Sequence, residues 1–185
     1  YQQVLTTEKF MTSSTPLDQL YDFSYLIADD FPELGYVPEV KVDYIHESMQ
    51  DNFSPAAYMT SPIDNKTSEK IYLNPASIYL TDEHGNLTAD LDTKYLYTTL
   101  AHEGFPGHLY QNNYAVQSKQ PHIYRLLDRL GSSEGWAEYV GIDSYRIAEI
   151  GSEAFQKYMK LYNYLNIILV EYIDLKVNYD GWEVK

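Results

Sequence analysis

The spacing of apolar side chains changes along the chain, and each change predicts a different kind of element. A polar opening over residues 1–14 predicts irregular structure. Thr15 and Pro16 then supply a hydroxyl cap and a proline suited to a first helical turn, and apolar side chains recur at helical spacing to about Asp30. From Tyr36 the pattern becomes strand-like, and a turn follows. Strands are expected near 37–45, 56–60 and 70–74, and the turn at 81–86.

The second half of the chain has its apolar positions at helical spacing. Gly131 and Gly151 interrupt this pattern and separate neighbouring helices. The last helix carries the longest apolar stripe, which we assign to packing in the core. Helices are expected at 92–104, 107–118, 122–130, 133–149 and 152–178. The stripe consists of Tyr158, Leu161, Tyr162, Leu165, Ile168, Leu169 and Tyr172.

The predicted fold class is α+β and predominantly α-helical, with a small N-terminal β-sheet, antiparallel in part, followed by a helical region. A chain of 185 residues can form one sizeable core, so we expect a single domain over 1–185. Within it we assign 1–35 to an N-terminal segment and helix, 36–80 to the small sheet and 92–182 to the helical region. The chain begins at Tyr1 rather than Met, which suggests a piece of a longer protein.

Composition argues against several classes of partner. The chain carries 27 Asp and Glu against 13 Lys and Arg, a net charge of −14, whereas nucleic acids and anionic membrane surfaces bind basic patches. It contains no apolar run long enough for a transmembrane helix. Without Cys it forms neither disulfides nor thiolate metal sites, which leaves His and carboxylates as metal ligands. We therefore expect no nucleic-acid partner and no membrane insertion in these residues, while compartment and oligomeric state stay open.

The most informative stretch is the place where an apolar helix runs into a histidine and a glutamate. His102 and Glu103 close this helix, and His108 follows six positions after His102. Zinc hydrolases of the His-Glu-x-x-His type place two ligand imidazoles four residues apart on one helix face, with the glutamate as general base. Six residues give about 240° of rotation, so one regular helix could not direct both imidazoles at one metal. Pro106 and Gly107 predict a break that returns His108 towards His102.

A second motif supplies carboxylates further along the chain. Ser132 and Ser133 are good helix caps, and they precede Glu134 and Glu138, which share one helix face at i and i+4. Thermolysin-like enzymes complete a two-histidine zinc site with a glutamate from a later helix and orient the ligand imidazoles with outer carboxylates. We therefore assign Glu134 as the third zinc ligand and Glu138 as an orienting partner.

Both motifs also have simpler interpretations. In the first motif, the helix could simply end at Pro106-Gly107, with the two histidines serving only to cap it or to fill space. In the second motif, Glu134 and Glu138 could be solvated acids of an acidic protein. The fit between the two motifs favours the metal site. The other histidines have no assigned role: these are His46, His84 and His122.

The two motifs resemble the signatures of a known family. The segments His102-Glu103-Gly104-Phe105-Pro106-Gly107-His108 and Glu134-Gly135-Trp136-Ala137-Glu138-Tyr139 are similar to the H-E-G-x-P-G-H-H and E-G-W-A-x-Y patterns of the domain of unknown function 885 family. Val170–Trp182 is similar to that family's V-D-x-G-x-H-x-x-G-W region. The family resembles the Glu-zincin metallopeptidases. The resemblance, which covers residues 36–182, therefore implies a zincin-like fold, a bound zinc and a peptide substrate.

The chain departs from the family pattern at two positions. Leu109 replaces the second histidine of the family's final pair, and Asn178 stands where a histidine is expected. If either histidine takes part in the chemistry, this chain is altered or weak in activity. Family members are also much longer, so the resemblance implies that these residues form the C-terminal catalytic portion of a longer protein.

The assigned residues imply hydrolysis of a peptide bond. A zinc held by His102, His108 and Glu134 keeps one position for water and lowers the pKa of that water. Glu103, which directly follows a ligand, is the expected general base: it takes the proton and passes it to the leaving amine.

Tyrosines are the candidates for the remaining roles. The tetrahedral oxyanion needs a donor besides zinc. Tyr139 from the second motif, Tyr145 and Tyr110 are the candidates, and Tyr139 enters the predicted catalytic set. An edge strand beside the metal helix can bind substrate backbone by strand addition, and Tyr58 is the candidate substrate-binding residue. Ordinary core pairing is the alternative for its strand.

Three functions compete on this sequence. A zinc-dependent peptidase is favoured by the paired motifs. A catalytically inactive zincin-like domain that binds peptide is favoured by the changes at Leu109 and Asn178. A purely structural helical domain, in which the His-Glu motif is a coincidence, is the third.

Overall fold

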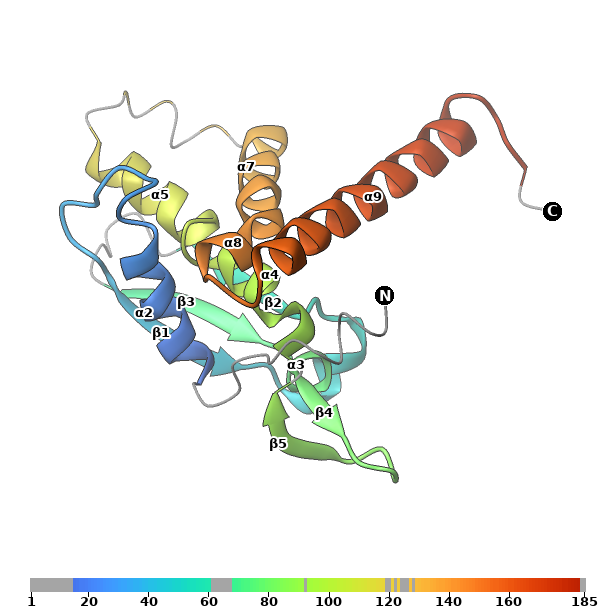
Figure 1. The fold of residues 1–185 in the computed structure, drawn as a ribbon, viewed down its shortest axis with the longest axis horizontal. Helices are drawn as coiled ribbons and strands as arrows, with labels where there is room; N and C mark the ends of the chain where they lie inside the picture. Colours follow the sequence, from blue (N-terminus) through green and yellow to red (C-terminus); the bar gives the residue numbers. More distant parts are fainter. Residues whose placement is uncertain are drawn as a thin grey trace.

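The computed structural model describes residues 15–60, 68–91, 93–118, 121, 123, 127 and 129–183. The predictions for residues 1–14 and for most of 122–130 lie outside these ranges. Within them the fold is α+β and mostly helical, as predicted, with a small sheet on one side of a group of helices (Figure 1).

The small predicted sheet has three strands, β1 (Glu39–Tyr44), β2 (Ala56–Met59) and β3 (Ser68–Leu73). Their order is β1-β3-β2, with β1 parallel and β2 antiparallel to β3. The prediction of a sheet that is antiparallel in part is therefore confirmed. The pairing also makes β2, which carries Tyr58, an edge strand of this sheet.

A short connection links the sheet to the helical half. It comprises a single helical turn, α3 (Pro75–Ile78), and a two-stranded hairpin, β4 (Tyr79–Thr81) with β5 (Leu87–Leu91). A 3-10 helix, η1 (Glu47–Asn52), lies earlier in the chain, between β1 and β2. The turn predicted at 81–86 is present between β4 and β5. The two strands that flank it were not predicted, because short strands give too little alternation to be recognised.

The predicted helices are largely confirmed where they are described. The first is α2 (Pro16–Leu26), and Thr15 and Asp18 form a capping box at its start. The others have the following bounds. They are α4 (Thr93–Glu103), α5 (His108–Gln117), α7 (Leu130–Ile142), α8 (Ser144–Ile147) and α9 (Glu153–Asn178).

The predicted helix over 133–149 differs from the structure in two ways. It is divided at Asp143 into α7 and α8. It also begins earlier, at Leu130, with Arg129 at the N-cap and no side-chain cap bond. The prediction that Ser132 or Ser133 caps this helix is therefore wrong, and the serine hydroxyls are free for other partners.

The core is centred on α4, which contacts α2, β2, α7 and α8. Leu100 and Ala101 in α4 are fully buried, as are Leu20 of α2 and Ile71 of β3. This arrangement places the end of α4, where the His-Glu pair lies, between the edge of the sheet and α7.

The last helix, α9, extends away from the rest of the molecule (Figure 1). Only its first turns are buried, at Phe155 and Met159. Beyond them its large apolar side chains are exposed, including Leu161 at 58%, Leu165 at 53% and Ile168 at 58%. The prediction that the whole stripe packs in the core is therefore wrong, because periodicity identifies an apolar face without showing what covers it. None of the helices in the described ranges has both the length and the apolar character needed to cross a membrane.

Candidate metal centre

The predicted break between the two histidines is present. Helix α4 ends at Glu103 and α5 begins at His108, and the residues between them form a tight turn with a cis peptide bond before Pro106. A Cβ atom on Gly107 would lie 1.8 Å from the carbonyl oxygen of His102, so no residue larger than glycine fits there. The Gly104 carbonyl accepts the N–H of Tyr110 at 3.1 Å and fixes the start of α5 on the end of α4.

The turn brings His102 and His108 together, and α7 adds Glu134. The two imidazole centroids are 4.8 Å apart with their planes at 87°. Glu134 Oε2 lies 3.6 Å from His102 Nε2 and 3.5 Å from His108 Nε2. All three potential ligand atoms lie within 4.8 Å of one another.

The two separations between Glu134 and the imidazole nitrogens fit a zinc site. They are too long for hydrogen bonds. Ligands bound at about 2.0–2.2 Å to a tetrahedral zinc are themselves roughly 3.3–3.6 Å apart. Two imidazole nitrogens and a carboxylate oxygen are also one of the donor sets found at catalytic zinc sites. Glu134 is exposed, so the cluster lies at the surface of the molecule.

The far nitrogen of each imidazole has its own partner. Glu138 Oε2 lies 3.3 Å from His102 Nδ1, which is the orienting position predicted for this residue. Ser133 Oγ lies 3.2 Å from His108 Nδ1. Such contacts fix the orientation of ligand imidazoles in metal sites. Ser133 was not predicted as a partner of His108, because its position suggested a helix cap; its place beside Glu134 is the signal in the sequence that could have indicated the contact.

The charges around His102 act on both members of its pair with Glu138. Burial alone would lower the pKa of His102, but the bond to Glu138 and the charges of Glu103, Glu138 and Glu134 raise it on balance. The same bond to His102 lowers the pKa of Glu138. The pair is thus electrostatically complementary, with Nε2 of His102 directed to Glu134.

Glu103 lies beside the cluster, and its carboxylate is fixed by the sheet. Its Oε2 accepts the backbone N–H of Tyr58 at 2.7 Å. Burial raises the pKa of Glu103, while this hydrogen bond and the charges of His102 and His108 oppose the rise. A half-buried carboxylate with a raised pKa, outside the His102-His108-Glu134 group, is chemically suited to accept a proton.

Small residues allow α7 to approach α4 closely enough to bring Glu134 to the histidines. Ala137 is fully buried, and a Cβ on Gly141 would lie 3.3 Å from the Thr98 carbonyl and 3.4 Å from Cβ of His102. Trp136 Nε1 donates to the Pro106 carbonyl at 2.7 Å, which joins α7 to the turn itself. The part of α7 that carries Glu134 and Glu138 is thereby packed directly against the turn between α4 and α5.

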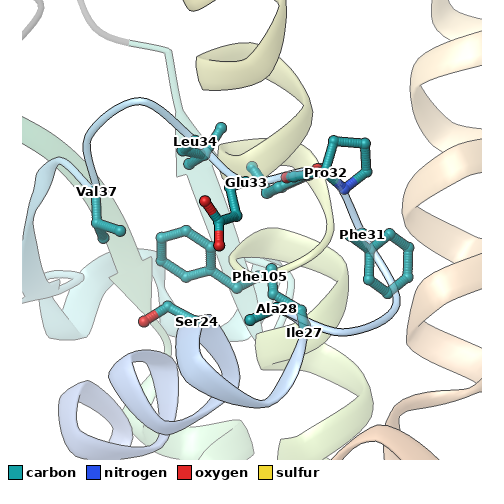
Figure 2. Close-up of a pocket in the computed structure, with 10 residues that line it drawn as sticks. Ser24, Ile27, Ala28, Phe31, Pro32, Glu33, Leu34, Val37 and Phe105 are labelled. Atoms are coloured by element: carbon teal, nitrogen blue, oxygen red, sulfur yellow. The ribbon is translucent and has the colours of Figure 1, made fainter.

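The back of the turn is anchored in an apolar cavity. Phe105, only 1% exposed, projects from the turn into a small space beside α2 and the segment that follows it (Figure 2). The walls of this space are mostly apolar. They include Ile27, Ala28, Phe31, Pro32, Leu34, Val37 and Tyr110.

The three tyrosines proposed as oxyanion donors are placed elsewhere. Tyr139 is 53% exposed and lines a cavity with Asp30 and Arg146. Tyr110 donates its hydroxyl to the Pro32 carbonyl at 2.6 Å. Tyr145 is 1% exposed and packs in the core against aromatic rings. Their positions give no support to a catalytic role, and the assignment of Tyr139 stays a prediction without geometric support.

Tyr58 lies near the site, but its side chain does not face solvent as a binding residue would. Its hydroxyl donates to Glu69 Oε2 at 2.9 Å and accepts from Asn112 Nδ2 at 2.8 Å. Its backbone N–H is directed at Glu103. The edge strand therefore lies beside the metal helix, as expected, and Tyr58 meets the site through its backbone.

The two departures from the family pattern lie outside the cluster. Leu109 is fully buried in the core. Asn178 ends α9 and donates to Asp174 at 2.7 Å, at the end of the helix that points away from the body of the molecule (Figure 1). Neither position contributes a ligand to the His102-His108-Glu134 cluster in this structure.

Comparisons with known proteins agree with the fold. The chain is similar to the crystal structure of "the putative lipoprotein from Colwellia psychrerythraea", with a TM-score of 0.58 and 20% sequence identity. The match covers 86% of this chain and 24% of that chain, so the chain spans about a quarter of its neighbour's length. Identity at this level shows a shared fold alone. No curated protein matches the chain.

The sequence also matches a family model. The family described as "Bacterial protein of unknown function (DUF885)" matches residues 28–184, and the chain belongs to it.

Proposed function

We propose that this member of the DUF885 family is a zinc-dependent hydrolase of peptide bonds. The observation that carries the proposal is that Glu134 Oε2 lies 3.6 Å from His102 Nε2 and 3.5 Å from His108 Nε2, with all three potential ligand atoms within 4.8 Å of one another. His102, His108 and Glu134 would hold the zinc, which would supply a Lewis acid able to acidify a water and polarise the scissile carbonyl. Zinc was expected from the sequence, and the placement of these atoms supports it. The peptide substrate stays a prediction from the family resemblance.

Glu103 is the general base of the proposed reaction. It follows the ligand His102 directly, and its carboxylate is half-buried beside both imidazoles. The Tyr58 amide holds one carboxylate oxygen at 2.7 Å, so the group has a fixed orientation. Glu103 accepts the proton of the attacking water and returns it to the leaving amine.

Glu138 and Ser133 keep the ligand imidazoles in place. Each contacts the Nδ1 atom of one histidine, which leaves the Nε2 atoms to face Glu134. Their role is to fix ring orientation, and their loss should weaken metal binding about 10- to 100-fold.

A metal-binding domain without hydrolytic activity is the second candidate. It is favoured by the positions of Tyr139, Tyr110 and Tyr145, which leave the oxyanion donor unassigned. A peptide-cleavage assay separates the two candidates, because both retain the metal.

The test combines zinc content with cleavage of a mixed peptide library. Glu103→Gln should retain zinc and lose hydrolysis by ~10²–10⁴-fold, the usual contribution of a general base. Glu134→Gln should lose zinc, and Glu83→Gln in the exposed β4–β5 turn is the matched control that should change neither. Zinc loss in Glu103→Gln with none in Glu134→Gln would reverse the two roles. Wild-type protein that binds zinc and cleaves nothing would establish the second candidate.

A further inference from the structure

A buried carboxylate lies close to the site and has no place in the proposed mechanism. Glu69, in the middle of the sheet on β3, is 4% exposed. A buried carboxylate is costly unless it is hydrogen-bonded. Its two oxygens accept from Tyr58 Oη at 2.9 Å and from Asn113 Nδ2 at 3.0 Å.

The Tyr58 hydroxyl is a dependable donor in this group. Burial, followed by the charge of Glu69, raises the pKa of Tyr58 well above its usual value. The phenol therefore stays protonated and donates to Glu69, while its oxygen accepts from Asn112. Hydrogen bonds that involve a charged group are the stronger ones.

These bonds join the three elements that surround the site. Glu69 belongs to β3 and Tyr58 to β2, while Asn112 and Asn113 belong to α5, the helix that begins with His108. Through its side chain Tyr58 is tied to β3 and α5, and through its backbone N–H it is tied to Glu103 on α4. One residue thus connects the buried carboxylate to the proposed base.

The strand that carries Tyr58 needs such a connection. β2 has four residues and pairs on one side only, with β3. In an antiparallel ladder successive residues direct their N–H groups alternately towards the partner strand and away from it. The Tyr58 N–H is directed away from β3, to Glu103. A short edge strand pairs weakly by itself, so side-chain bonds can decide where this N–H lies.

We propose that Glu69 is a positioning residue for Glu103: by holding the Tyr58 phenol it holds β2, and β2 presents the Tyr58 N–H that orients the Glu103 carboxylate. The inference rests on the proposed role of Glu103 as base. Glu69 touches neither metal ligand nor substrate in this scheme, and it acts only through Tyr58.

The test uses Glu69→Gln and Tyr58→Phe, which remove the charge or the hydroxyl and keep the shape. Tyr44→Phe is the matched control, because Tyr44 lies on β1 and its hydroxyl lies 3.1 Å from that of Tyr79, outside the Glu69 network. Amide hydrogen exchange is measured on the metal-free protein, so this readout does not depend on hydrolysis. Hydrolysis of the peptide library is measured on the zinc-loaded protein.

In both variants the backbone amide at position 58 should lose protection about tenfold, as expected for a local opening once the hydrogen bond between the position-58 side chain and Glu69 is removed. The amides of the β1–β3 pairing, such as Val42 and Ile71, should keep theirs. The turnover number should fall about tenfold with KM unchanged, because orientation of the base is lost and binding is not. Tyr44→Phe should change none of these quantities.

The outcomes separate this inference from the proposed function. Unchanged exchange at Tyr58 in the folded variants overturns the inference, whatever the activity. Selective loss of Tyr58 protection in a protein that hydrolyses nothing supports the connection between Glu69 and Glu103 and removes the peptidase instead. Equal loss of protection throughout the sheet assigns Glu69 a merely structural role. If Glu69→Gln does not fold, Tyr58→Phe decides alone.

Discussion

Two helical regions of this chain are rich in apolar residues, and only one of them is covered. In α7, Ala137 and Val140 are fully buried against α4. In the outer half of α9, Ile168 is 58% exposed and Val170 is 67% exposed. The buried region uses small side chains that let two helices approach, whereas the exposed one uses large aliphatic side chains. The candidate site therefore belongs to the packed region, and the outer half of α9 contributes little to it.

The stability of the molecule should reside mainly in the packed region around α4. The contact of α4 with α7 and with the turn holds the three potential ligands within 4.8 Å of one another, so changes there should affect folding and metal binding together. Changes in the outer half of α9 should affect neither. Four substitutions or additions, from the largest expected effect to the smallest, test this division.

The largest effect is expected at Gly107. In Gly107→Ala the new Cβ would lie 1.8 Å from the His102 carbonyl oxygen, and a backbone atom cannot move aside as a flexible side chain can. We expect a loss of more than ~4 kcal/mol in the free energy of unfolding, or no folded protein. Gly135→Ala in α7 is the control, because nothing lies within 4 Å of its Cβ position; there alanine should stabilise by ~0.5–1 kcal/mol. Urea unfolding measures both, and a tolerated Gly107→Ala would contradict the close approach.

The next effect concerns the inner end of α9. Phe155 is 1% exposed and packs edge-on against Tyr145 with ring centroids 5.7 Å apart. Phe155→Ala should lower the free energy of unfolding by ~3–5 kcal/mol, as large-to-small core substitutions do. The measurement is again urea unfolding, with the dependence of the unfolding free energy on urea concentration unchanged between wild type and variant. A loss below ~1 kcal/mol would mean that α9 is not anchored to the core at all.

The same two regions show what could be predicted from the sequence. The break before His108 was predictable because proline and glycine impose local rules. The grouping of His102, His108 and Glu134 was predictable because zinc ligands follow fixed chemical types, and the structure brings these three side chains together. The positions of Ser133 and Tyr139 were not, since they depend on where α7 begins and on how it is rotated against α4.

The prediction that the apolar stripe of α9 packs in the core was wrong for a related reason. Helical periodicity shows that one face is apolar, and the burial of that face depends on partners that periodicity does not specify. The network of Glu69 was likewise outside reach, because it joins β3, β2 and α5 through residues far apart in the sequence. Local rules were therefore enough to identify the candidate His102-His108-Glu134 cluster, whereas the contacts that surround it depend on tertiary packing.

The third effect concerns the metal. Zinc bound by His102, His108 and Glu134 would join α4, α5 and α7, so it should stabilise the packed region. At a free zinc concentration about 100 times Kd the free energy of unfolding should rise by ~2.7 kcal/mol. Thermal unfolding with and without zinc measures this, and a chelator should reverse it. His102→Ala should abolish the rise. A rise of equal size in His102→Ala would place the bound zinc elsewhere.

The smallest effect is expected on the outer half of α9, and it tests the comparison most directly. Ile168→Ala removes the same kind of apolar surface as a core substitution, but at a side chain that is already 58% exposed. Because this side chain is already largely in contact with water in the folded protein, shortening it removes little buried apolar surface. Alanine also favours a helix slightly more than isoleucine does. The free energy of unfolding should therefore change by no more than ~0.5 kcal/mol, against ~3–5 kcal/mol for Phe155→Ala in the same helix. Both variants are measured by urea unfolding at two protein concentrations. A loss above ~1 kcal/mol for Ile168→Ala that grows with protein concentration would show that this face is packed between copies in solution. The division between a covered and an uncovered region would then hold for the single chain and not for the protein in solution.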